Sequence, residues 1–158
     1  KKLDADSTDF NQDRLNEIVL WKVNRYAQFD NELIRAINEI DPKSENIDVG
    51  QTTEILRGLL KTKGVQLAMA STILRFRNPN VYQIIDQRVF RIIYPSQELN
   101  LSSYLSEKTI NVQIELYLKY LEDLHKVCDK LQIDFKISDR VLFMADRRLN
   151  KGFKLKNY

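Results

Sequence analysis

Apolar residues recur at intervals of three and four positions along most of this chain, and polar residues fill the positions between them. This spacing is typical of a helix with one buried face. The longest segment of this kind runs from about residue 109 to 131, and shorter ones cover about 51–61 and 66–77. No segment alternates apolar and polar residues as a half-buried strand would. The pattern therefore predicts an all-α fold, a compact bundle of six to eight helices.

Side chains that cap helices indicate where several helices begin, because their oxygens accept the unpaired N–H groups of a first turn. Asp30 precedes one apolar segment, and Asp86 precedes a short one that ends at Tyr94. Ser7 or Asp9 can cap a first helix in the same way. The apolar positions of this first helix are Leu15, Ile18, Val19, Trp21, Val23 and Tyr26.

The last helix is expected to start at Ser138 or Asp139 and to end at Gly152, since glycine readily leaves the helical conformation. We expect its inner face to be apolar. The residues assigned to that face are Val141, Leu142, Met144, Ala145 and Leu149.

Basic residues dominate the end of the chain, from 140 to 158. The only acid there is Asp146, whereas the basic residues are Arg140, Arg147, Arg148, Lys151, Lys154 and Lys156. The whole chain carries a formal net charge of +3. Such a basic end suits a polyanion such as nucleic acid. A tail that only improves solubility would have the same composition, so charge alone leaves both interpretations open.

Length and composition exclude several classes of protein. A chain of 158 residues is the size of one domain, which we expect to span 1–158. No run of about eighteen apolar residues is present, so no membrane helix is expected. The single cysteine, Cys128, excludes an internal disulfide and a metal site built from several cysteines. His125 lies three residues before it, but two ligands do not make a metal site. We expect no metal, no cofactor and a cytoplasmic location.

The most informative stretch runs from 59 to 93. Gly64 interrupts two helical segments, and glycine allows the positive φ that a tight turn requires. The two segments and the turn predict a helical hairpin over about 55–77. Asn78-Pro79-Asn80 then ends the second helix, and a short apolar connection leads to Asp86.

This stretch resembles the helix-hairpin-helix (HhH-GPD) superfamily of DNA glycosylases. The family hairpin has the form Leu-Pro-Gly-Val-Gly, and here residues 62–66 are Thr-Lys-Gly-Val-Gln. The family aspartate lies in a segment like Val-Asp-Thr-His-Val, and here residues 85–89 are Ile-Asp-Gln-Arg-Val. The interval between the two motifs matches without a gap. Residues 64–74 and 82–86 are more similar still to a poorly characterised bacterial branch, which has Gly-Val-Gly-Val-Pro-Val-Ala-Ser-Ala-Leu-Leu and Tyr-Pro-Ile-Ile-Asp.

The resemblance implies a DNA N-glycosylase that removes a damaged or modified base, with Asp86 as its catalytic carboxylate. Members that cleave the strand carry a lysine where this chain has Ala68, so water rather than an amine is expected to attack. Gln66 replaces the second hairpin glycine, and the cysteine cluster of several members is absent. The residues expected to bind DNA are Lys61, Lys63, Gly64, Val65, Gln66 and Arg88, with Arg147, Arg148 and Lys151 of the basic end.

Two other interpretations stay open at this point. Asp86 can act only as a helix cap, in which case the chain is a DNA-binding helix-hairpin-helix module without catalysis. The chain can also be a helical interaction protein that never meets DNA. Under the leading interpretation the partner is double-stranded DNA and the protein is a monomer, and the sequence leaves any protein partner unknown. Trp21, Tyr26, Tyr82, Tyr94 and Tyr104 are candidates to stack on a base, although each is also a plausible core residue.

Overall fold

The computed structural model describes residues 27–102, 106–153 and 155. Within these ranges the chain forms six α-helices, one short 3-10 helix and no strand, which confirms the all-α class. The expected first helix lies outside the described residues. The helices are α2 (Asn31–Glu39), α3 (Val49–Lys61), α4 (Leu67–Arg77), α5 (Gln87–Ile93), α6 (Glu107–Leu131) and α7 (Ser138–Leu149), with η1 (Phe135–Ile137) between the last two.

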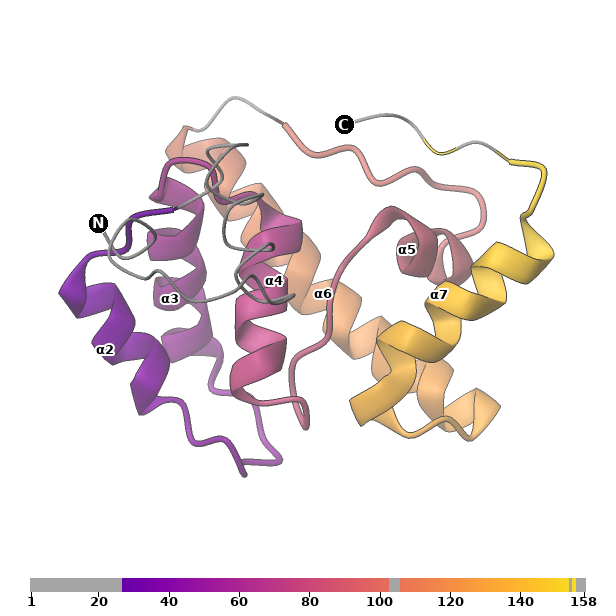
Figure 1. The fold of residues 1–158 in the computed structure, drawn as a ribbon, viewed down its shortest axis with the longest axis horizontal. Coiled ribbons are helices and arrows are strands. Elements are labelled where there is room, and N and C mark those ends of the chain that lie inside the picture. Colours follow the sequence, from indigo (N-terminus) through magenta and orange to yellow (C-terminus); the bar gives the residue numbers. More distant parts are fainter. Residues whose placement is uncertain (1–26, 103–105, 154, 156–158) are drawn as a thin grey trace, which may run out of the picture.

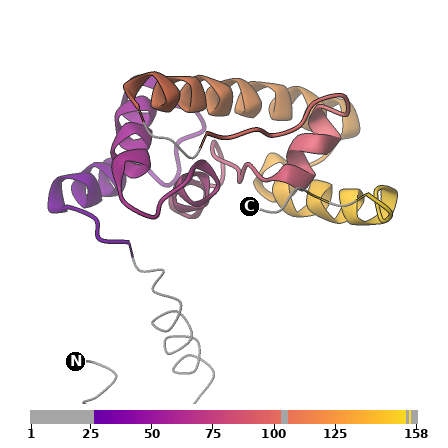
Figure 2. The ribbon, with the colours of Figure 1, turned by 90° about the horizontal axis from the view of Figure 1, so that it is seen from above.

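The long helix α6 organises the molecule. It runs along the whole bundle, with α2, α3 and α4 at one end and α5 and α7 at the other (Figures 1 and 2). Helix α3 packs against the first part of α6, whereas α5 packs against both α6 and α7. The connection from α4 to α5 crosses between the two groups of helices (Figure 1). The start of α5 is therefore placed where the two groups meet.

Polar caps fix most helix starts, and they account for the differences from the expected boundaries. Asp30 and Asp86 cap α2 and α5, as predicted. Helix α3 starts earlier than expected because Asp48 accepts the N–H of Gln51 at 2.9 Å. Helix α6 also starts earlier, at a capping box between Ser106 and the third residue of the helix.

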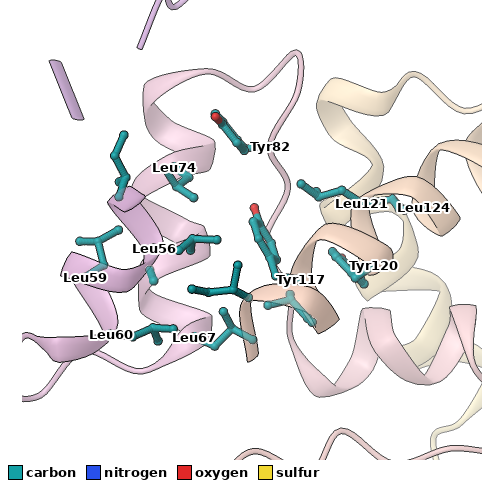
Figure 3. Close-up of a cluster of buried hydrophobic side chains, with 14 of the residues drawn as sticks. Leu56, Leu59, Leu60, Leu67, Leu74, Tyr82, Tyr117, Tyr120, Leu121 and Leu124 are labelled. Atoms are coloured by element: carbon teal, nitrogen blue, oxygen red, sulfur yellow. The ribbon is translucent and has the colours of Figure 1, made fainter. Parts of the chain in front are cut away.

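Leucine and tyrosine side chains fill the core between α3, α4 and α6 (Figure 3). The side chains of Ile55, Leu56, Leu59 and Leu60 in α3 are all buried. Tyr82, Tyr117 and Tyr120 are also fully buried. The residues drawn in this cluster include Leu56, Leu59, Leu60, Leu67, Leu74, Leu121 and Leu124.

The inner face of α7 differs from the prediction. Val141, Met144 and Leu149 are exposed by 38%, 45% and 74%, so they do not belong to the core. Leu142 is buried as predicted, and the carboxylates of Asp139 and Asp146 share the inner face with it. The apolar pattern was misleading because these acids are buried through pairing with arginines. The helix also ends at Leu149 rather than at Gly152, since Asn150 forms its C-cap.

In the described part of the chain, no helix combines the length and the apolar character needed to cross a membrane.

Candidate functional site

The turn between α3 and α4 has a geometry that can accept an anion. Gly64 adopts φ +86°, as expected for glycine in this turn. The N–H of Val65 donates to the carbonyl of Thr62 at 3.0 Å, and its side chain is buried, so the turn is fixed. Gln66 is the N-cap of α4, yet its side chain makes no capping hydrogen bond. The first N–H groups of α4 are therefore not used by a side-chain cap, and such groups bind phosphate well.

Replacing Gly64 by alanine is expected to lower the free energy of unfolding by about 1–2 kcal/mol. A Cβ at this position would meet nothing within 4 Å, so the cost is conformational and not steric. Urea unfolding of the variant measures it. Gly152→Ala is a matched control, because its Cβ would also meet open space and its φ is not in the positive region. Equal stabilities of the two variants would contradict the assignment of the turn.

Two lysines flank this turn, and they differ in their surroundings. Lys63 is exposed, and the described residues offer it no ion-pair partner. Lys61 pairs with Glu107 at 2.7 Å, and Arg57 reaches the same carboxylate at 3.2 Å. Hydrogen bonding from Lys61 is the main cause that lowers the pKa of Glu107. Lys63 is therefore the more available cation beside the turn.

The connection from α4 to α5 is held in place by side chains of α4 and α6. Tyr117 and Tyr120 of α6 donate their hydroxyls to the carbonyls of Gln83 and Ile84, at 3.0 and 2.7 Å. The N–H of Ile85 donates to the hydroxyl of Ser71 in α4 at 3.2 Å. Figure 3 shows both tyrosines within the buried cluster. These bonds fix the residues that lead directly to Asp86.

Asp86 is positioned at the start of α5. One oxygen of its carboxylate accepts the N–H of Val89 at 2.8 Å, and the residue remains partly exposed. Burial raises the pKa of Asp86, and the nearby Asp146 adds to this effect. The N–H groups of Val89 and Arg88 and the guanidinium of Arg88 oppose it without cancelling it. A carboxylate with a raised pKa is a stronger base, which suits activation of water.

A buried ion-pair network lies beside Asp86. The carboxylate of Asp146 is fully buried in α7. Arg91 binds it through two hydrogen bonds of 2.8 and 2.7 Å, Arg88 through one of 3.0 Å, and Asn150 through one of 2.7 Å. Burial would raise the pKa of Asp146, but these hydrogen bonds outweigh it and lower the pKa. The network joins α5 to α7. It engages one of the two terminal nitrogens of the Arg88 guanidinium.

The second acid of α7 also faces an arginine, but as an ion pair without a hydrogen bond between the two side chains. Asp139 lies 3.6 Å from the guanidinium of Arg75 in α4, and both side chains are nearly buried. Because both acids of α7 point inward, its outer surface keeps only positive charges. The exposed cations of this surface are Arg140, Arg147 and Arg148 of α7, together with Lys151 just beyond its end. We call it the basic face of α7.

The sequence did not identify Asp146 and Arg91 as parts of the site. In the sequence Asp146 is only the single acid of a basic segment, and nothing in the local pattern distinguishes Arg91 from a solvent-exposed arginine. A usable signal was present, since Arg88 and Arg91 are three residues apart and so share one face of α5. Arg88 was expected to contact DNA, and its guanidinium is now seen to bind Asp146 and to lie 5.4 Å from the ring of Phe143.

The remaining candidate site residues that the structure describes are buried, stacked on a ring or hydrogen-bonded to other residues of the fold. Tyr82 is buried, and its hydroxyl bonds Thr52 at 2.7 Å. Tyr94 donates to Asp123 at 2.8 Å. Trp21, Tyr26 and Tyr104 lie outside the described residues. The ring of His125 stacks on Phe135 with 3.7 Å between centroids, and Cys128 is buried.

In Figure 1 the turn between α3 and α4, the start of α5 and the end of α7 all lie towards the upper edge of the molecule. Asp86, Arg88 and Asp146 belong to one connected group, whereas the turn between α3 and α4 lies at the other end of the bundle (Figure 1). Comparison of the chain with models of protein families, with curated proteins and with solved structures gives no match. A functional assignment therefore depends on the geometry of these residues.

Proposed function

We propose that this chain is a monofunctional DNA N-glycosylase-like protein that removes a damaged or modified base by attack of water. The observation that carries the proposal is the position of Asp86. It is a partly buried carboxylate with a raised pKa, held at a helix start by a connection that three side chains fix. Precise support of this kind is what a catalytic carboxylate requires.

Asp86 has two roles in the proposed reaction, one towards the sugar and one towards the attacking water. The bond between the sugar and the base breaks, and the base leaves with the electron pair, so the sugar becomes cation-like. The ionised carboxylate of Asp86 stabilises that positive charge and accepts a proton as water forms the new bond to the sugar carbon. The proton then passes to the departing base, which leaves neutral and returns the carboxylate to its ionised form. The base must first leave the helical stack, which costs a few kcal/mol and least for a damaged base.

Duplex binding would use main-chain and side-chain groups together. The N–H groups at the start of α4 and the exposed Lys63 can hold one phosphate. The basic face of α7 can hold others, because both acids of that helix are buried and neutralised. Contacts of this type fix the position of a protein on DNA without reading sequence.

The salt dependence of duplex binding tests this assignment. The double variant Arg147→Glu/Arg148→Glu is expected to weaken binding and to reduce the slope of log K against log salt by about 0.9 for each phosphate contact that is lost. Fluorescence anisotropy with a labelled duplex measures both quantities. Lys119→Glu/Lys126→Glu is a matched control on α6, since both lysines are exposed and already paired with Asp123. Equal slopes in the two variants would exclude the basic face from binding.

A DNA-binding module without catalysis is the second candidate function. It is favoured by the structural roles of the central residues, because Asp86 caps α5 and Arg88 is engaged by Asp146. Release of free base from duplexes that each carry one altered base separates the two candidates. The glycosylase-like function predicts release from at least one duplex, whereas the module predicts binding with no release from any of them.

A further inference from the structure

The outer surface of η1 and α7 carries apolar side chains among its cations. Val141 and Met144 are both exposed and three residues apart, so they share one face of α7. Ile137, immediately before the helix, is exposed by 45%, and Phe153, beyond its end, by 70%. With Leu149, this segment holds five of the eleven large apolar side chains that are exposed in the described part of the chain. Such a concentration marks a surface that binds a partner.

The same segment presents cations and no exposed acid. Asp139 and Asp146 point inward, where they pair with arginines of α4 and α5. Asp134, just before η1, accepts the N–H of Lys136 as the helix cap. Charge complementarity therefore selects an anionic partner. The exposed charged side chains of residues 136–153 are all positive, and they are Lys136, Arg140, Arg147, Arg148 and Lys151.

The cations border the apolar pair on the helix surface. Arg140 and Arg148 lie four residues before and after Met144. Arg147 lies three residues after it, so all three cations are its neighbours on α7. Helix α7 lies along the outer edge of the bundle and packs mainly on α5 and η1 (Figures 1 and 2). Its exposed side therefore faces away from the bundle, where a broad partner can lie against it.

An anionic bilayer accounts for both kinds of side chain. Nucleic-acid phosphates would pair with the cations, but they offer nothing to the apolar residues between them. At a bilayer, arginine and lysine contact anionic headgroups, while apolar side chains of the same helix enter the boundary of the acyl chains. The aliphatic stems of the arginines lie along that boundary with their charges at the headgroups. The mixture of side chains therefore favours a lipid surface over a nucleic acid.

We propose that the outer surface of η1 and α7 binds a membrane surface rich in anionic lipid. Val141 and Met144 enter the acyl boundary, and the surrounding cations contact the headgroups. Leu149 and Phe153 extend the apolar contact beyond the end of the helix. This inference goes beyond the proposed function and does not depend on it, although a bilayer and a duplex would compete for the same arginines.

Cosedimentation with vesicles tests the proposal. The wild type is expected to bind vesicles of equal parts phosphatidylcholine and phosphatidylglycerol, and not vesicles of phosphatidylcholine alone. Val141→Asn/Met144→Gln should weaken binding to the mixed vesicles about tenfold or more, because two apolar side chains no longer insert. Duplex binding of this variant should equal that of the wild type, since the arginines remain. Arg147→Gln/Arg148→Gln should weaken vesicle binding about fivefold for each charge that is removed.

Val112→Asn is the matched control, because Val112 is an exposed apolar residue of α6, outside this surface. Its vesicle binding should equal that of the wild type, and circular dichroism should show all variants folded. Absence of binding to the mixed vesicles at low salt would overturn the proposal. Equal vesicle binding by Val141→Asn/Met144→Gln and the wild type would do the same. So would an equal loss of duplex binding in that variant, because its apolar pair would then contact nucleic acid.

Discussion

Replacing Asp146 by alanine is expected to lower the free energy of unfolding by about 3 kcal/mol, because it leaves two partly buried arginines without their counter-charge. The carboxylate is fully buried, and Arg88 and Arg91 keep only 29% and 21% of their side chains exposed. Urea unfolding followed by circular dichroism measures the loss. We expect α7 to separate from α5 in this variant, because the network is the charged link between the two helices.

Glu107→Ala is the matched control for this prediction. Glu107 also holds two cations, Lys61 at 2.7 Å and Arg57 at 3.2 Å, but its side chain is 65% exposed. Its removal should change stability little, because exposed ion pairs are screened by water. A triple variant in which Arg88, Arg91 and Asp146 all become apolar should recover most of the stability that Asp146→Ala loses. Equal losses in Asp146→Ala and Glu107→Ala would contradict the account.

The sign of the pH dependence adds a second check on Asp146. Its pKa is lowered in the folded protein, so the unfolded chain binds more protons in the acid range. The stabilisation is therefore complete above the ordinary pKa of 3.8 and is lost as the pH falls below it. Asp146→Ala should consequently approach the wild type in stability as the pH is lowered through this range.

Replacing Asp86 by asparagine is expected to reduce base release by about 10²–10⁴-fold, the usual contribution of a general base. Its stability at neutral pH should equal or exceed that of the wild type. Asparagine caps helices as well as aspartate does, and it carries no charge to be buried. Asp86→Ala should also lose activity, but it should destabilise the protein by about 1 kcal/mol through the lost cap. Loss of activity without loss of stability is the signature of a functional residue.

The pH dependence of Asp86 has the opposite sign from that of Asp146. Because its pKa is raised, the folded protein binds more protons than the unfolded chain in the acid range. Stability of the wild type relative to Asp86→Asn should therefore fall as the pH rises above the ordinary pKa of 3.8, and then level off. A difference that is constant between pH 3 and pH 7 would contradict the raised pKa.

Much of the fold could be predicted from the sequence, because its determinants are local. Periodic apolar residues and capping side chains placed the start of α2 and both bounds of α4 and α5 close to where they are observed. The caps at Asp30 and Asp86 were correct, since such a side chain needs only its own first turn. The positive φ of Gly64 was also predictable from the turn that contains it.

The inner face of α7 could not be predicted in this way. A periodic pattern counts apolar side chains and so identifies Leu142, whereas the other buried residues that hold this face in place are Asp139 and Asp146. Their burial depends on Arg75, Arg88 and Arg91, which are far away in sequence and approach only in the folded chain. The tyrosine hydroxyls that fix the connection to Asp86 are long-range contacts too. The inner face of α7 therefore depends on ion pairs between distant parts of the chain, which the local spacing of apolar residues does not reveal.

Base release from duplexes with single altered bases is the most direct test of the central claim, that Asp86 is a catalytic carboxylate. The assay should compare the wild type with Asp86→Asn, and it should quantify free base before and after alkaline cleavage of the strand. We expect the wild type to release at least one altered base and to leave the strand intact until alkali is added, because Ala68 offers no amine. Asp86→Asn should bind the same duplex and release almost none. Release by Asp86→Asn at the wild-type rate, or no release from any duplex by the wild type, would contradict the claim.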